Sequence, residues 1–324
     1  MHVSMQEPGL CGPPRPVDEF ELIRRYFQRQ VTSPDVITGI GDDGAVVRPP
    51  LGKELVTVID TLVAGTHFPV TMDAADVGYR AVAVNLSDIA AMGARPRWMT
   101  MALTLVDAEE SWLEGFANGL HQAASEWDVQ LVGGDTTRGG TFVVSVQMTG
   151  DVDPGNAILR SGARAGDTIY VTGTLGDAAA GLDRSSTVST NDFLFTRFAR
   201  PSARVAAGLA LSGVANAAID VSDGLVADLG KILEASEVGA EVDVNLLPLS
   251  EPLLDAVGAE QALRFALGGG DDYELCFTMP ELKLPAELPC EITAIGRVTD
   301  SGQLVCLDRG VVVPFDDSGY RHFR

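Results

Sequence analysis

Residues 83–94, AVNLSDIAAMGA, form the most informative stretch of the chain, because they place polar side chains in an otherwise apolar helix. The apolar pattern predicts a helix from Asp76 to Met92 that ends at Gly93. Asn85 and Asp88 are three residues apart, so they share one helical face with Met92. A polar face of this kind needs partners if it is buried.

Acidic residues beside glycine recur at predicted loops and strand ends. Taken singly, each has an ordinary explanation, since Asp-Gly is a favoured turn and Asp caps helices. Asp60 and Asp220 differ, because each ends an apolar run where no turn residue is required. The acidic motifs are Gly41-Asp42-Asp43-Gly44, Ile59-Asp60-Thr61, Ser87-Asp88, Gly133-Gly134-Asp135-Thr136, Ile219-Asp220-Val221-Ser222-Asp223-Gly224 and Gly268-Gly269-Gly270-Asp271-Asp272.

Together, these motifs favour a cation site. A divalent cation satisfies several carboxylates at once, and a ligand set made of oxygen atoms suits magnesium rather than zinc. A core network of Arg–Asp ion pairs is the competing interpretation. The chain has no Gly-x-x-x-x-Gly-Lys-Ser/Thr loop and no protein-kinase set of motifs. Magnesium that bridges phosphate oxygens can support phosphoryl transfer without them, so we predict chemistry on a phosphorylated substrate.

The composition argues against two classes of partner. A net charge of −22 disfavours nucleic acid, whose binding depends on Lys and Arg that neutralise phosphates. No apolar run of about 18 residues is present, so we expect no membrane span. Residues 1–17 lack the basic start and apolar run of a secretory signal. The cysteines show no Cys-x-x-Cys spacing, which favours reduced thiols and a cytoplasmic protein; they are Cys11, Cys276, Cys290 and Cys306.

The length of 324 residues predicts two domains. Residues 1–17 are rich in Pro and Gly and are expected to form a flexible tail. Residues 18–150 form the predicted N-terminal domain, and the Asp-Val-Asp-Pro-Gly segment from residue 151 suggests a hinge. Residues 151–324 form the second. Both mix strands and helices without strict βαβ alternation, which predicts α/β or mixed α+β layers.

Further elements follow from local periodicity. The predicted helices are Glu19–Gln30, Glu109–Trp127, one that ends near Ser236, and Gln261–Leu267; the predicted strands are Ala45–Val47, Leu55–Ile59, Val129–Val132, Thr141–Thr149, Thr168–Thr172, Ala217–Val221 and Glu274–Thr278. We also expect a hairpin that joins Thr293–Val298 to Leu304–Leu307 through Asp300-Ser301-Gly302.

In combination the motifs resemble the thiamine-monophosphate kinase family of the aminoimidazole-ribonucleotide synthetase-like superfamily. The resemblance extends from about Glu19 to Phe323. The Asn-Leu-Ser-Asp helix and the Gly-Gly-Asp-Thr loop recur across the superfamily, whereas two other segments point to this family. The segments that carry it are residues 39–43, 60–68 with His67, 83–94, 133–137, 219–225, and Asp272-Tyr273-Glu274-Leu275.

The resemblance implies ATP-dependent phosphorylation of thiamine monophosphate to thiamine diphosphate by direct in-line transfer, with several Mg²⁺ ions. It also implies a two-domain fold whose N-terminal domain contributes to a dimeric β-barrel in a homodimer, with ATP between the domains. We expect no catalytic side chain, since the acceptor phosphate has a second pKa of about 6 and is already largely ionised. The implied metal ligands are Asp43, Asp60, Asp88, Asp135, Asp220 and Asp223; the ATP contacts are Gly134, Asp135, Arg160 and Ser222; the thiamine phosphate contacts are His67, Asp271 and Tyr320.

The chain departs from the family pattern at two places. Val58-Ile59 stands where the family usually has hydroxyl residues, so a side-chain metal oxygen is lost there. Asp271 stands where Glu is more common, which shortens the reach by one methylene. Both departures lie in the expected site.

Two alternatives to this function were weighed. One is another enzyme of the superfamily, such as a selenophosphate or aminoimidazole-ribonucleotide synthetase or a carbamoyl dehydratase. The first normally needs a reactive Cys near its Gly-rich loop, whereas Cys11 lies in the Pro-rich tail, and the last carries a C-terminal Cys, whereas this chain ends His322-Phe323-Arg324. The second alternative is a non-enzymatic acidic cation-binding module, which would predict a regular acidic repeat.

Overall fold

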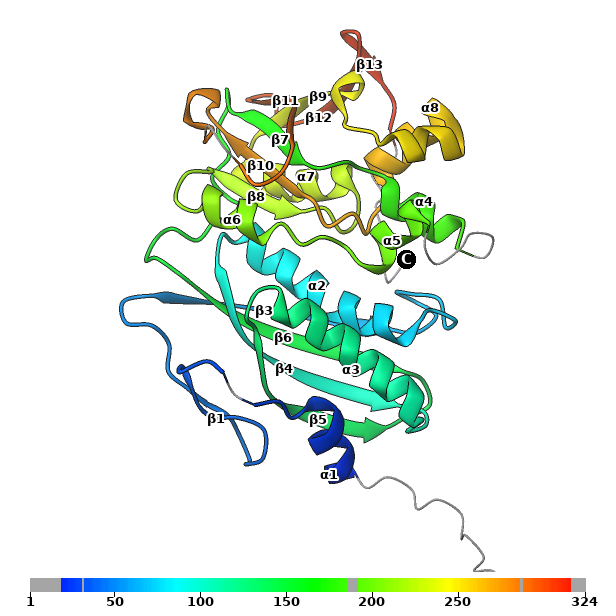
Figure 1. Ribbon diagram of the computed structural model, residues 1–324. Helices are drawn as coiled ribbons and strands as arrows, with labels where there is room; N and C mark the ends of the chain where they lie inside the picture. Colours follow the sequence, from blue (N-terminus) through cyan, green and yellow to red (C-terminus); the bar gives the residue numbers. More distant parts are fainter. Residues whose placement is uncertain (1–18, 31, 186–191, 286–287, 316–324) are drawn as a thin grey trace, which may run out of the picture.

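Helix α2 (Ala74–Ala91) lies between two layers of strands in the computed structural model, which describes residues 19–30, 32–185, 192–285 and 288–315 (Figure 1). On one side is a four-stranded sheet, and on the other a seven-stranded sheet with its helices. Because α2 packs against strands of both sheets, its polar residues lie at the contact between the two halves.

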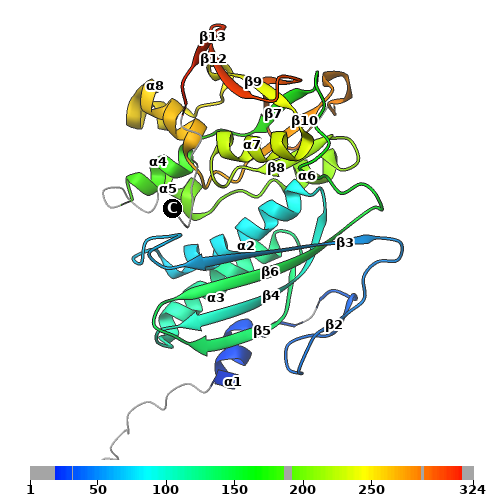
Figure 2. The same cartoon turned by 180° about the vertical axis from the view of Figure 1, so that it is seen from behind.

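The four-stranded sheet has the order β3-β6-β4-β5. Its strands are β3 (Glu54–Val63), β6 (Val143–Val152), β4 (Arg95–Leu105) and β5 (Gln130–Arg138). Only the β4–β5 pair is parallel. Helices α2 and α3 (Glu110–Ser125) cover one face, while no described helix covers the other (Figure 2).

Glycine lets α2 and α3 pack with their backbones in contact. A Cβ atom at Gly78 would lie 2.0 Å from the carbonyl oxygen of Phe116, and one at Gly119 would lie 1.8 Å from that of Ala75. The Asp73 side chain caps α2 by accepting a hydrogen bond from the Ala75 N–H. The Asp73 cap thus fixes where α2 begins, and the two glycines fix how closely α2 packs on α3. Both set the position of Asp88.

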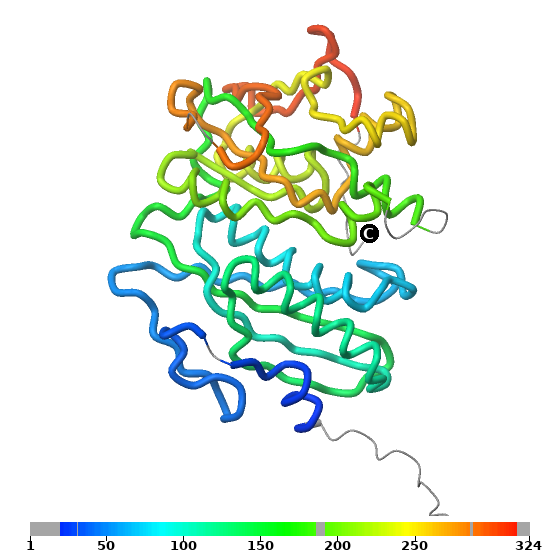
Figure 3. The backbone as a smooth tube through the Cα atoms, viewed as in Figure 1, coloured from blue at the N-terminus to red at the C-terminus, as the bar shows by residue number. Residues whose placement is uncertain are grey.

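The first described residues pack beside the same sheet (Figure 3). Helix α1 (Glu19–Leu22) continues into a π-helical turn, η1 (Ile23–Phe27). The rings of Phe27 and Phe116 pack edge to face, with their centroids 6.3 Å apart. The short strands β1 (Val36–Thr38) and β2 (Val46–Val47) follow, and Val36 packs on Trp98 and Val132. This segment therefore borders β4 and β5.

The seven-stranded sheet has the order β13-β12-β9-β11-β7-β10-β8. Its strands are β7 (Thr168–Thr172), β8 (Ala217–Asp220), β9 (Gly239–Asp243), β10 (Leu275–Met279), β11 (Ile292–Thr299), β12 (Leu304–Asp308) and β13 (Val311–Val313). The helices of this half are α4 (Asp177–Asp183), α5 (Phe193–Ala199), α6 (Val205–Leu211), α7 (Leu225–Ser236) and α8 (Glu251–Gly268), with 3-10 turns η2 (Val244–Leu246) and η3 (Glu281–Lys283).

Strand β10 separates two apolar cores. Phe277 and its alternate neighbours face a core that continues through α2 to the four-stranded sheet, whereas Cys276 faces a second core under α7. Because the first core is continuous across α2, the two halves are held together by apolar packing. No helix among the described residues is long and apolar enough to cross a membrane.

Most predicted elements are present with shifted ends. The predicted helices 76–92 and 109–127 correspond to α2 and α3, and the predicted strand Thr168–Thr172 is β7. The first predicted helix is wrong beyond Phe27, where the chain leaves the π turn, and the predicted helix Gln261–Leu267 is part of the longer α8, which is kinked at Gly258. The proposed domain boundary at residue 150 falls inside β6, which continues to Val152.

Four expectations about the strands differ from the structure. Strand β4 was not predicted, since Arg95-Pro96-Arg97 resembles a loop. The predicted loop at Gly133-Gly134-Asp135 is part of β5, and Asp60 lies within β3 rather than at its end. The predicted hairpin is absent from the described sheet, because β9 lies between β11 and β12 and pairs with both.

Candidate functional site

Two carboxylates from different halves of the protein lie near each other at the end of β8. Asp88 is on α2, and Asp220 is the last residue of β8, with 4% of its surface exposed. The Ser87 hydroxyl donates a hydrogen bond of 2.8 Å to Asp220 Oδ2. This bond ties α2 to the seven-stranded sheet at the point where both carry acid groups.

Asp60 of β3 adds a third negative charge to this group, which we call the carboxylate cluster (Asp60, Asp88 and Asp220). Burial, together with the charges of Asp220 and Asp60 and against that of Arg160, raises the pKa of Asp88 to about 8. Burial likewise raises the pKa of Asp220 to about 7, against the Ser87 hydrogen bond and with a contribution from Asp228. Few donors or positive charges therefore stabilise the ionised forms of the cluster.

Asn85, one turn before Asp88 on α2, is fully buried. Its amide nitrogen donates to the Ala81 carbonyl at 3.0 Å. Its oxygen Oδ1 has no hydrogen-bond partner among the described residues. Buried amide oxygens are rarely left without a donor or a cation.

A cavity of about 970 Å³ opens between the two halves and is called here the interdomain cavity. Five residues predicted from the sequence line it, and they come from β3, the loop that follows it, and two loops of the second half: Asp60, His67, Ser222, Asp223 and Asp271. The expected metal, ATP and thiamine phosphate contacts are therefore partly brought together in one space.

His67 lies in the tight turn after β3. The Val63 N–H donates to His67 Nδ1 at 3.0 Å, and the His67 N–H donates to the Val63 carbonyl at 2.9 Å. A ring whose Nδ1 accepts a hydrogen bond carries its own hydrogen on Nε2 when neutral. The turn thus fixes the orientation of the ring at the cavity wall.

The loop after β8 is held in shape by Asp228, which the sequence analysis did not single out. The N–H groups of Ser222 and Asp223 both donate to Asp228 Oδ2 at 2.9 Å. Lys231 donates to Asp223 at 2.6 Å and to Asp228 at 2.8 Å. Asp228 is fully buried, so this fixed network presents Ser222 and Asp223 to the cavity.

Arg80 and Tyr273 also line the cavity and were missed. Arg80 is buried and ion-paired with Asp271, which the sequence analysis assigned to the thiamine phosphate. The available signal was its position on α2, two turns before Asp88 and on the same face. Arginine alone at such a position is usually solvated, so the pattern did not distinguish it.

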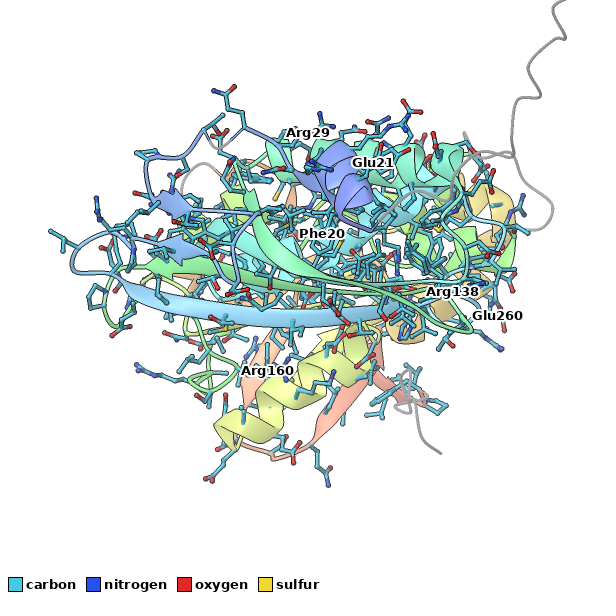
Figure 4. All side chains as sticks on the ribbon, turned by 90° about the horizontal axis from the view of Figure 1, so that it is seen from below. Phe20, Glu21, Arg29, Arg138, Arg160 and Glu260 are labelled. Carbon is cyan, nitrogen blue, oxygen red and sulfur yellow. The ribbon has the colours of Figure 1, made fainter. Side chains whose placement is uncertain are left out.

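Arg160, an expected ATP contact, lies beside α7 below the four-stranded sheet (Figure 4). Its carbonyl accepts a hydrogen bond of 3.2 Å from Ser236, the last residue of α7. Its side chain is exposed, and its charge opposes the raised pKa of Asp88. Arg160 is thus a positive group within electrostatic reach of the carboxylate cluster.

Three expected contacts lie elsewhere. Asp43, Gly134 and Asp135 line a separate cavity of about 770 Å³ beside β5 and η1. In the sheet order, β3 and β5 are opposite edges, so Asp60 and Asp135 are separated by three strand spacings, or about 14 Å. One copy of the chain therefore does not unite the predicted ligands. Tyr320 lies outside the described residues.

Within the described ranges, no three His, Cys, Asp or Glu side chains, those of the carboxylate cluster included, are close enough together to hold a metal ion without other ligands. Magnesium, however, keeps several waters and is usually held by one or two carboxylates together with substrate phosphates. The paired carboxylates Asp88 and Asp220 and the unpartnered oxygen of Asn85 are suited to that mode. The residues present therefore fit magnesium that arrives with a phosphorylated ligand.

Both halves match the AIR synthase related proteins: the model of the N-terminal domain matches residues 41–152, and that of the C-terminal domain matches residues 164–308. The thiamine-monophosphate kinase of Escherichia coli (strain K12) is 49% identical over 319 residues, which cover 94% of this chain and 98% of that protein. The chain belongs to the thiamine-monophosphate kinase family.

Solved structures agree with this assignment. The crystal structure of thiamine-monophosphate kinase from Stenotrophomonas maltophilia K279a has a TM-score of 0.84 and 44% identity, with 92% of this chain and 98% of that chain covered. The structure of AaThiL complexed with AMPPCP and TMP has a TM-score of 0.77 and 34% identity, with coverage of 94% and 97%. The two-domain AIR synthase related fold expected from the sequence is confirmed.

Proposed function

We propose that this protein is a thiamine-monophosphate kinase, which transfers the γ-phosphoryl group of ATP to thiamine monophosphate and forms thiamine diphosphate. The observation that carries the proposal is full-length similarity to proteins of that activity, at 49% identity in one case. A relative of 34% identity complexed with AMPPCP and TMP supports a site for a nucleotide and a thiamine phosphate. In this protein, the ATP contacts would be Gly134, Asp135, Arg160 and Ser222. The thiamine phosphate contacts would be His67, Asp271 and Tyr320.

The chain's own residues mainly bind and orient. A phosphomonoester oxygen is already largely ionised near pH 7, since its second pKa is about 6, so no side chain has to remove a proton. The task is to hold two polyanions in line. We assign His67, fixed by its turn, and Asp271, ion-paired with Arg80, to the acceptor. Arg160 and the Ser222 loop are assigned to the donor.

The proposed magnesium ligands are Asp43, Asp60, Asp88, Asp135, Asp220 and Asp223. When bound, magnesium would neutralise phosphate charge that the protein's few lysines cannot. The carboxylate cluster supports this assignment, because its like charges are held together with few donors. Val58 and Ile59 supply no side-chain oxygen beside Asp60, so ligation at that point depends on the carboxylate and backbone. We place the enzyme in the cytoplasm, which suits the free thiols of Cys276, Cys290 and Cys306.

We further propose a homodimer in which the uncovered face of the four-stranded sheet forms a β-barrel with its equivalent. No described helix covers this face in Figure 2. Strand β3 exposes apolar side chains, with Leu55 50% and Ile59 66% exposed. Asp60 and Asp135 lie at opposite edges of the sheet, so a second copy is a way to bring Asp135 to Asp60. The proposed site would then combine residues of two chains.

Incubation of the protein with ATP, magnesium chloride and thiamine monophosphate should yield thiamine diphosphate, detected by chromatography. A well-folded preparation that forms none would contradict the proposed function. Aminoimidazole-ribonucleotide and selenide substrates serve as controls for the alternative activities of the superfamily.

The shared site has its own test. Asp60→Ala and Asp135→Ala should each be inactive as homodimers. If every site draws on two chains, an equimolar mixture that exchanges subunits should recover about a quarter of wild-type activity, because half the dimers are mixed and each mixed dimer has one intact site. A mixture that stays inactive after proven exchange would indicate that each site belongs to one chain.

A further inference from the structure

Arg80 is the largest charged side chain buried at the contact between the two halves. It has 1% of its surface exposed and forms part of the wall of the interdomain cavity. Buried arginine is rare unless it is paired, and pairing normally reflects a position that the structure needs. Its partners therefore indicate what it does.

In the part of the chain that the structure describes, the hydrogen bonds and ring contacts of the Arg80 guanidinium are all made with the other half of the protein. One terminal nitrogen donates to Asp271 Oδ1 and the other to the Phe198 carbonyl. Its plane lies over the Phe198 ring at 4.3 Å and near the Tyr273 ring at 5.4 Å. The remaining nitrogen, Nε, is buried and has no hydrogen-bond partner in the described ranges. Its hydrogen bonds to Asp271 and to the Phe198 carbonyl and its stacking on the Phe198 ring thus occupy the guanidinium with contacts inside the protein.

Asp271 is held in an unusual backbone conformation next to the proposed nucleotide loop. Its φ is 69°, in the left-handed region that few non-glycine residues adopt. Its N–H donates to the Ser222 carbonyl at 2.9 Å, and the Tyr273 N–H donates to the Val221 carbonyl at 2.9 Å. Gly270 permits this approach, since a Cβ there would lie 2.2 Å from the Ser222 oxygen.

The Asp271 carboxylate is engaged on one side. Both of its hydrogen bonds from described side chains, from Arg80 and from the Tyr273 hydroxyl at 3.4 Å, fall on Oδ1. The side chain is 27% exposed at the cavity. Its second oxygen, Oδ2, is therefore the one that can accept a hydrogen bond from a ligand.

We propose that Arg80 is a positioning residue for the phosphate acceptor: it holds Asp271 across the contact between the halves so that Oδ2 meets a hydrogen-bond donor of the thiamine part of the substrate. This inference rests on the proposed function. It also couples the acceptor to the donor side, because the same Asp271 backbone is bonded to Ser222. A lysine could not replace it fully, since an ammonium group cannot bond two acceptors in a planar fork and stack on a ring at the same time.

Arg200 offers a matched control. It also joins the second half to α2, with its Nε bonded to Asp76 at 2.5 Å and its guanidinium 5.2 Å from the Tyr79 ring. Unlike Arg80, it is not among the residues that line the interdomain cavity. Arg80→Met and Arg200→Met therefore remove similar contacts between the same two parts, and only the first touches Asp271.

We expect Arg80→Met to raise KM for thiamine monophosphate about tenfold or more, as the loss of a charged hydrogen bond does, with a small change in KM for ATP. Arg200→Met should change neither KM, although both variants should lower Tm. Arg80→Lys should lie between wild type and Arg80→Met. An equal change in the two KM values, or the same change in Arg200→Met, would overturn the proposal.

If Arg80→Met does not fold, a double-mutant cycle with Arg80→Lys and Asp271→Asn decides the matter. Less-than-additive effects on KM for thiamine monophosphate are expected, because both changes break one interaction, and additive effects would refute it. Calorimetric measurement of thiamine monophosphate binding without ATP separates the role of Arg80 from the proposed kinase activity. If the wild-type protein binds thiamine monophosphate but forms no thiamine diphosphate, the proposed kinase activity is contradicted. The role of Arg80 is then tested by comparing the binding constants of the wild-type protein, Arg80→Met and Arg200→Met for thiamine monophosphate.

Discussion

Glu274, immediately before β10, and Asp220, the last residue of β8, are buried carboxylates with opposite surroundings. Leu275, which follows Glu274, pairs with Asp220 across β10 and β8. Glu274 accepts hydrogen bonds of 2.6 to 2.7 Å from Arg204, Arg197 and the Thr172 hydroxyl. Asp220 has only the Ser87 hydroxyl as a side-chain donor in the described structure and is surrounded by Asp60, Asp88 and Asp228.

The difference separates a structural carboxylate from one available for function. Positive charge cannot reach Glu274 from outside, because two arginines already occupy its oxygens. Burial and its acidic neighbours make the ionised form of Asp220 unfavourable, which raises its pKa. A protein usually keeps such an uncompensated group where a ligand compensates it. A network of arginine and carboxylate groups, the interpretation that competed with the metal site, is thus present around Glu274.

The largest expected effect is on catalysis. Asp220→Asn should lower kcat/KM by about a thousandfold, since magnesium-held phosphate charge is worth several kcal/mol in the transition state. The folded state should lose little or no stability, because the change relieves repulsion from Asp60 and Asp228. Kinetics at saturating magnesium, together with thermal unfolding, test both parts. Near-normal activity at limiting magnesium would mean that Asp220 is not a ligand.

Replacement of Glu274 should have the reverse effect, with a loss of stability rather than of activity. Glu274→Gln leaves Arg197 and Arg204 without their carboxylate, which should cost about 3–5 kcal/mol in the free energy of unfolding. At low temperature, where Glu274→Gln remains folded, its kcat should stay within a few-fold of the wild-type value. Denaturant unfolding and kinetics at 10–15 °C make the comparison. If activity falls far more than stability, Glu274 also belongs to the functional site.

The sequence predicted the side of the site that α2 and β8 build, because its signal is local. A carboxylate such as Asp88 in an apolar helix, or Asp220 after an apolar strand, needs a partner wherever the helix or strand packs. The identity of the Glu274 partners was not predictable in this way. Arg197 and Arg204 come from α5 and from the residue before α6, and only tertiary packing brings them to β10.

The strand order could not be predicted from the sequence. The separation of Asp135 from Asp60 depends on that order, so it could not be predicted either. Strand β4 begins with Arg95-Pro96-Arg97, and its pairing with β6 shifts register beside Pro96, so its sequence lacks a regular strand pattern. Without β4, the local pattern gave no reason to place β5 at the far edge of the sheet. Arg80 was missed for a related reason: its burial depends on Phe198 and Asp271, which are more than a hundred residues away.

The smallest expected effect is the pH dependence of stability that Asp88 and Asp220 contribute. Asp88 and Asp220 have folded-state pKa values of about 8 and about 7, raised above the ordinary value of 3.8. Between those limits the folded state binds more protons than the unfolded state, so the free energy of unfolding falls as pH rises from about 4 toward 8. Without magnesium, Tm should drop by a few degrees over this range. Magnesium should reduce the drop, because a ligand of the ionised folded state stabilises it. In Asp88→Asn the drop should shrink, whereas Glu274→Gln should keep it; a magnesium-independent drop of equal size in both variants would show that these carboxylates are not its source.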